Sequence, residues 1–134
     1  HSGAIDSTKD FLELPRFPIN EKYGEIERFR SIINTLPFPY ENITPENRYL
    51  KDNQNPPQVR IKFYEDLINI KNIGCYSNEG DRWRKSEIKF LNTNEILISI
   101  NEKFTTERGR INCSLLENNG KWRWLGIQYV VSEL

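Results

Sequence analysis

The sequence predicts an α+β domain in which N-terminal helices pack on a curved four-stranded antiparallel meander sheet. Apolar residues recur at helical spacing early in the chain, within residues 21–36. Over roughly the last 50 residues they instead alternate with polar neighbours, as in half-buried strands. Clusters of Asn, Thr and Gly separate the alternating segments and mark hairpin turns. Helices followed by sequential strands favour an α+β fold with one antiparallel sheet.

The 134 residues suffice for one domain whose core needs neither a metal nor several disulfides. Residues 1–19 are expected to be a tag remnant, His1-Ser2-Gly3, followed by an extended arm that contains two prolines and no sustained periodicity. Residues 20–134 are then a single α+β domain.

The first helix is expected from Glu21 to Leu36. Asn20 is a suitable N-cap, and Pro37 ends the helix because its ring disfavours helical geometry in the residue before it. Its apolar residues share one stripe, which should pack on the sheet. The stripe consists of Tyr23, Ile26, Phe29, Ile33 and Leu36.

Residues 37–57 are rich in Pro and Asn and are expected to form a long loop with one short helix, capped by Thr44 and starting at Pro45. The next segment, residues 58–73, fits two structures.

In residues 58–73, Val59, Ile61 and Phe63 alternate as in a strand, whereas Phe63 and Leu67 have the i, i+4 spacing of a helix. Two prolines precede the segment and a glycine follows it, as at the two ends of a helix, and we therefore favour a helix.

Four strands are expected after this segment, each identified by alternating apolar residues. The apolar sets are Ile88 and Phe90; Ile96, Ile98 and Ile100; Ile111, Cys113 and Leu115; and Leu125, Ile127, Tyr129 and Val131.

The register of the last hairpin depends on the length of its turn. A two-residue turn would place Leu115 opposite Trp124, whereas a three-residue turn at 118–120 places Cys113 opposite Leu125. The second register gathers the aliphatic side chains on one face, so we expect it, with Cys113 pointing into the core.

The run from Asn118 to Tyr129, NNGKWRWLGIQY, resembles the final hairpin of NTF2-like domains, whose last strand often reads NGKW before an alternating apolar strand. The resemblance implies a cystatin-like α+β cone, with helices packed against a strongly bent sheet, in a secreted or periplasmic domain. That family includes isomerases, dehydratases, secreted lipoproteins, secretion-system parts and toxin-immunity proteins, so membership implies a fold more than a function.

Three scarce residue types indicate an exported chain with little catalytic chemistry. There is no Met, which indicates processing, and the only His is His1. Without another imidazole, Ser/His/Asp and Cys/His triads and most zinc sites are excluded. The two cysteines, Cys75 and Cys113, are expected to form a disulfide; two buried thiols are the alternative. The predicted location is the periplasm or cell envelope, with a lipid anchor upstream of residue 1 left open.

The charge balance argues against two classes of partner. Lys and Arg number 19, as do Asp and Glu, so the net charge is zero and a nucleic-acid partner is not expected. No apolar stretch is long enough for a transmembrane span. The sequence also has no phosphate-binding or metal-binding motif, so no cofactor and no metal are expected.

Aromatic and basic residues gather in two short segments, and Trp and Arg are the types enriched at binding hot spots. We expect these residues to contact a protein partner, unless the N-terminal arm covers the tryptophans as a second small core. The candidate residues are Trp83, Arg84, Trp122, Arg123, Trp124 and Leu116.

The leading hypothesis is a non-catalytic exported domain that binds a protein partner, such as a toxin that it neutralises or an envelope or secretion complex. One alternative is an isomerase or dehydratase for a small apolar substrate, using Glu102 or Asp66 with Tyr64 or Tyr129. Another is a carrier of a glycan or small ligand. The oligomeric state is not predicted.

Overall fold

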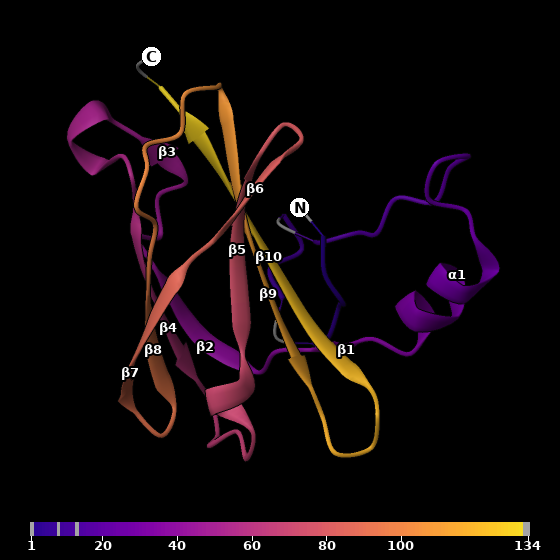
Figure 1. The fold of residues 1–134 in the computed structure, drawn as a ribbon. Helices are drawn as coiled ribbons and strands as arrows, with labels where there is room; N and C mark the ends of the chain where they lie inside the picture. Colours follow the sequence, from indigo (N-terminus) through magenta and orange to yellow (C-terminus); the bar gives the residue numbers. More distant parts are fainter. Residues whose placement is uncertain (1, 8, 13, 133–134) are drawn as a thin grey trace.

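The protein is a sandwich of two β-sheets with one short helix beside it (Figure 1). The structure is a computed structural model, and it describes residues 2–7, 9–12 and 14–132. The predicted α+β fold is therefore wrong, because helices do not cover a single sheet. Instead, the two sheets cover each other and bury one apolar core between them.

The first sheet has six strands. In spatial order they are β1 (Leu36–Pro37), β10 (Trp122–Val131), β9 (Arg108–Leu116), β5 (Gly74–Glu79) and β6 (Arg82–Lys85), and β3 (Tyr49–Leu50) also pairs with β10. The second sheet has four strands, in the order β2 (Tyr40–Thr44), β4 (Gln58–Phe63), β8 (Glu95–Ser99) and β7 (Glu87–Asn92). Two 3₁₀ turns, Asp52–Gln54 and Ile70–Asn72, lie in the connections.

The four predicted strands exist, but they do not form a meander. Strands β7 and β8 make a hairpin in the second sheet, and β9 and β10 make a hairpin in the first. Residues 100–107 carry the chain from one sheet to the other. Alternation identifies a strand and its buried face. Both sheets of a sandwich bury an apolar face, so alternation does not tell which sheet a strand joins.

The helix favoured for residues 58–73 is also wrong. Val59, Ile61 and Phe63 are fully buried while the residues between them are exposed, which is the period of two of strand β4. Its central position between β2 and β8 explains why this segment takes the strand alternative. The short helix expected at Pro45 is absent as well, since that residue follows β2 in a loop.

The N-terminal helix is shorter than expected, and it does not pack on a sheet. Helix α1 (Ile26–Ile33) begins after Glu25, because Asn20 belongs to a separate turn, where its side chain accepts the N–H of Tyr23. None of its residues is buried, and it stands beside the sandwich in Figure 1. The apolar stripe therefore remains largely exposed, with Ile26 at 61%.

The last hairpin has the register expected of a three-residue turn. Cys113 lies opposite Leu125 and both are buried. Cys113 also lies opposite Cys75 of β5, and the two form the predicted disulfide. This bond agrees with the predicted export, because disulfides persist in oxidising compartments such as the periplasm. Among the helices of the described chain, none has the length and apolar character required to cross a bilayer.

Polar groups tie the 100–107 crossover to the rest of the sandwich. The buried carboxylate of Glu79 accepts hydrogen bonds from the backbone N–H groups of Thr105 and Thr106 and lies 3.4 Å from a guanidinium nitrogen of Arg84. Arg84 also bonds Glu102 at 2.8 Å. These contacts hold the crossover against β5 and β6, and we call them the Glu79 clamp.

Candidate functional site

Strand β10 has a gap in pairing along the edge that faces away from β9. On this edge β1 pairs with residues 123–124, Gly3 of the arm bridges to Leu125, and β3 pairs with residues 130–131. Within the described chain, no strand pairs with residues 126–129 on this side, although the backbone of Ser2 lies against Gly126 at one end of this stretch. Figure 1 shows β1 and β3 at opposite ends of β10.

The backbone of Gln128 faces this gap. The N–H groups of Val130 and Ser132 point away from β9, because they donate to carbonyls of residues 48 and 50. Strand groups alternate in direction with a period of two, so the N–H and C=O of Gln128 point the same way. Such edge groups can accept another strand.

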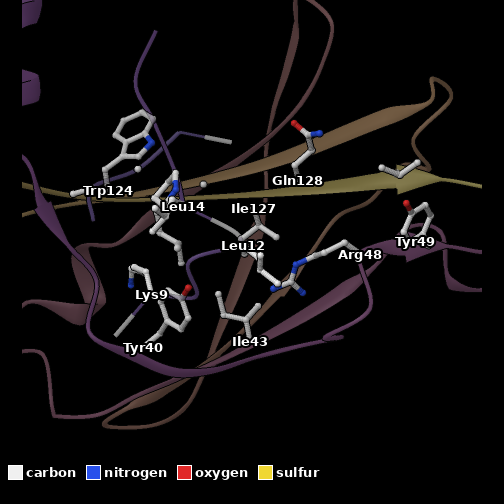
Figure 2. A pocket seen from close by; sticks show the side chains of 16 residues that line it. Lys9, Leu12, Leu14, Tyr40, Ile43, Arg48, Tyr49, Trp124, Ile127 and Gln128 are labelled. Carbon is white, nitrogen blue, oxygen red and sulfur yellow. The ribbon is translucent and has the colours of Figure 1, made fainter. Parts of the chain in front are cut away.

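A cavity of about 350 Å³ lies beside the gap (Figure 2). It is bounded by the arm, by β2 with the loop that follows it, and by β10. Its labelled side chains in Figure 2 are Lys9, Leu12, Leu14, Tyr40, Ile43, Arg48, Tyr49, Trp124, Ile127 and Gln128. The lining combines aliphatic, aromatic and cationic groups, and within residues 2–7, 9–12 and 14–132 it includes no carboxylate.

Lys9 is a buried cation whose contacts lie within the protein. Its ammonium donates to the Phe38 carbonyl at 3.1 Å, lies 3.8 Å from a carboxylate oxygen of Asp6, and sits 3.8 Å from the centre of the Tyr40 ring. Burial lowers the pKa of Lys9, and the nearby Asp6 offsets part of this effect. Lys9 therefore serves mainly to anchor the arm to β2.

Arg48 is the second cation of the cavity, and it has fewer partners. Its guanidinium donates to the Pro45 carbonyl and lies 5.6 Å from the centre of the buried Tyr129 ring. It forms no ion pair with a carboxylate of the described residues. Burial raises the pKa of Tyr129 to about 12 although Arg48 opposes the shift, and no hydrogen bond of normal geometry satisfies the phenol.

The predicted tryptophan surface forms only in part. Trp122 lies opposite Leu116 on the outer face of the first sheet, and both are exposed. Trp124 lies on the same face but is partly covered by the arm, with the Phe17 ring 6.2 Å away. Trp83 is exposed at the far end of the sheet, on β6.

The two arginines predicted with these tryptophans have structural partners. Arg84 belongs to the Glu79 clamp. Arg123 is partly buried and bonds the Glu117 carboxylate and the Pro37 carbonyl, the latter at 2.6 Å. These contacts hold Arg123 at the junction of β10 with β1.

The acid–base residues of the enzymatic alternative do not converge. Glu102 is exposed and paired with Arg82 and Arg84, whereas Tyr129 is buried in the core. Tyr64 and Asp66 lie exposed in the connection after β4. Among the described residues, no group of three or more His, Cys, Asp or Glu side chains could hold a metal.

Sequence reasoning missed the residues that line the cavity. Lys9 lies in a segment interpreted as a loose arm, and Arg48 lies in a long loop without periodicity. The even-numbered side of β10 carried only a weak signal, because Gly126 and Gln128 interrupt the apolar residues of that side between Trp124 and Val130. The gap itself depends on where the distant strands β1 and β3 pair.

Two solved structures are similar to this chain, and the first of them supports the β-sandwich. CopC from Methylosinus trichosporium OB3b is similar with a TM-score of 0.51 and 9% identity, over 71% of this chain and 95% of that one. PcoC, a copper resistance protein from Escherichia coli, has a TM-score of 0.49 and 12% identity, over 69% and 98%. No family model and no curated protein sequence matches the chain.

The CopC-like shape overturns the resemblance to NTF2-like domains, which rested on one hairpin. A hairpin with an Asn-Gly turn and tryptophans occurs in a sandwich as readily as in a cone, because its register depends on local turn chemistry. The functions inferred through that family are therefore wrong: toxin neutralisation, a place in an envelope or secretion complex, and isomerase or dehydratase activity. The carrier alternative assumed the same fold and is dropped with it.

Proposed function

We propose that this protein is an exported, non-enzymatic domain that binds an extended peptide segment by strand addition at residues 126–129 of β10. The observation that carries the proposal is the gap in pairing between β1 and β3. A peptide that enters the gap would gain backbone hydrogen bonds from β10, as in other β-augmentation complexes.

Two features of the site support strand addition. First, Gly3 already pairs with Leu125 at one end of the gap, so this edge accepts a strand from outside the two sheets. Second, the adjacent cavity gives room for side chains of an added strand, which would alternate between the cavity and the outer face. The lining provides cations, phenols and an amide, groups suited to recognition.

PcoC is a copper resistance protein, but the described residues of this chain do not suit a copper site. Copper sites in proteins are built mainly from imidazole, thiolate and thioether ligands. The sequence has no Met, its single His is residue 1, outside the described residues, and both cysteines are in the disulfide. Copper therefore has no part in the proposal.

Selection of peptides tests the proposal directly. Random heptapeptides displayed on phage are panned on the immobilised full chain, and the selected peptides are titrated by fluorescence anisotropy. Gln128→Pro removes the backbone N–H that faces the gap, whereas Gln128→Ala removes only the side chain. We expect at least about a tenfold loss of affinity for Gln128→Pro, the value of about one backbone hydrogen bond, and little loss for Gln128→Ala.

Hydrogen exchange of the wild-type protein gives a second readout that needs no substitution. A bound peptide should slow exchange of the backbone amides in residues 126–129 more than elsewhere in β10. Circular dichroism of both Gln128 variants checks that they fold. Peptides that bind Gln128→Pro and wild type equally, without protection of residues 126–129, would refute strand addition at this edge.

A further inference from the structure

The polar groups around the cavity are mostly hydrogen-bond donors. Arg48 has five N–H groups, and its one hydrogen bond to protein in the described residues goes to the Pro45 carbonyl. The indole N–H of Trp124, which also lines the cavity, is buried without a partner. Gln128, Tyr40 and Tyr49 can accept hydrogen bonds as well as donate them, so the groups that need an acceptor from a ligand are the free N–H groups of Arg48.

The charge of the lining points in the same direction. Arg48 is a cation without a carboxylate partner among the described residues, and none of the described residues that line the cavity is an Asp or Glu. Lys9 differs, because its ammonium is already held by the Phe38 carbonyl and by Asp6. Arg48 is therefore the cation available to a ligand, and its planar fork matches a carboxylate.

Aliphatic side chains surround these donors. Ile43 of β2 and Ile127 of β10 line the cavity, and Leu12 of the arm lies at its border with 93% of its surface exposed. A ligand group in the cavity would therefore meet a cation within apolar walls. Such walls lower the local dielectric and strengthen a charge-assisted hydrogen bond.

We infer that the cavity selects an acidic side chain, Asp or Glu, on the added peptide strand, and that Arg48 binds its carboxylate. This inference rests on the proposed strand addition and specifies the class of peptide. The backbone of the peptide pairs with residues 126–129, and its acidic side chain points into the cavity, with the neighbouring side chains on the outer face. The backbone hydrogen bonds of strand addition provide affinity, and the contact with Arg48 provides specificity for acidic peptides.

The test uses the strongest peptide from the phage selection in two versions, with its acidic residues intact or replaced by Asn and Gln. Both versions are titrated against wild type, Arg48→Gln, Arg48→Lys and the control Arg30→Gln. Arg30 is an exposed arginine of α1 that does not line the cavity, so its replacement makes the same change of net charge.

We expect wild type and Arg30→Gln to prefer the acidic peptide by about tenfold, as for one charge-assisted hydrogen bond. Arg48→Gln should lose this preference yet still bind the amide version, and Arg48→Lys should keep part of it. Thermal unfolding of each variant checks that it folds. Selected peptides without acidic residues, or an equal preference in wild type and Arg48→Gln, would overturn the inference and leave strand addition standing. Absence of any binding peptide would overturn both.

Discussion

Replacement of Glu79 by Gln should destabilise the sandwich without removing any apolar contact. The Glu79 side chain is 3% exposed, and its carboxylate accepts the N–H groups of Thr105 and Thr106 while it faces Arg84. An amide of the same shape keeps one acceptor oxygen but presents an NH₂ group where a second acceptor was. Both crossover N–H groups donate to the same oxygen, Oε1, so a glutamine that keeps its carbonyl there leaves the Arg84 N–H that faced Oε2 without its partner.

The size of the effect follows from these contacts. Loss of a charge-assisted hydrogen bond to a buried group costs about 1.5–3 kcal/mol, and removal of one partner of a buried ion pair costs about 3–5 kcal/mol. Arg84 keeps its ion pair with Glu102 at 2.8 Å. We therefore expect the free energy of unfolding to fall by about 3 kcal/mol, the lower end of the cost for a broken buried ion pair. For a domain of 134 residues this corresponds to a decrease in Tm of about 10 °C.

The effect should also depend on pH. Burial raises the pKa of Glu79, but the hydrogen bonds from Thr105 and Thr106 outweigh it, so the pKa lies below its ordinary value of 4.5. A carboxyl with a lowered pKa stabilises the folded state above the unfolded pKa, and this stability is lost as the pH falls through the folded pKa. The difference between wild type and Glu79→Gln should therefore be largest near pH 7 and shrink below about pH 4.5.

Urea unfolding followed by tryptophan fluorescence at several pH values measures this difference. Glu102→Gln is the matched control, because Glu102 belongs to the same network but is 53% exposed, and exposed ion pairs contribute less than about 1 kcal/mol. The reasoning is refuted if Glu79→Gln costs no more than Glu102→Gln at pH 7. It is also refuted if the cost stays constant down to pH 3.

Three further predictions follow from the fold and the composition. The double substitution Cys75→Ala with Cys113→Ala removes a disulfide between residues 38 positions apart. It should lower the free energy of unfolding, measured in urea, by about 4 kcal/mol, and an unchanged value would contradict this prediction. Gly109→Ala would place a Cβ 2.3 Å from the ring of buried Phe104 and should cost about 1–3 kcal/mol, so a thermal unfolding curve like that of wild type would count against this packing. Competition with a chromogenic chelator should show no tight Cu(II) binding in His1→Ala, and a retained stoichiometric site would show that we have misjudged the donor set.

Local features of the final hairpin were predictable because they depend on nearby residues. Asn118-Asn119-Gly120 set the turn, the turn set the register, and the register placed Cys113 on the buried face. The disulfide followed from the cysteine count and the signs of export. Residues 58–73 were less predictable, because a short apolar run fits both the strand period and the helix period. Pairing with the neighbouring strands β2 and β8 decides between the two.

The candidate site shows the limit of sequence reasoning most clearly. The register predicted for the last hairpin implies that Trp122 lies opposite Leu116, as the structure has it. Arg84, in contrast, belongs to the Glu79 clamp, where it pairs with Glu102, 18 residues away in the sequence. Gln128 and Arg48 carry no motif, and they lie at one cavity only because β3 pairs with the end of β10. Whether the tryptophan surface binds a partner stays a prediction.

The sequence by itself determined four of the strands, the last hairpin with its buried face, and the lack of any imidazole beyond His1, because these depend on residue identity and on periods of a few residues. Only the tertiary structure decided that the strands divide between two sheets, that the helix stands aside, and that β10 has an unpaired stretch beside a cationic cavity. Pairing between distant strands depends on how apolar faces from the whole chain cover one another. No local period carries that information.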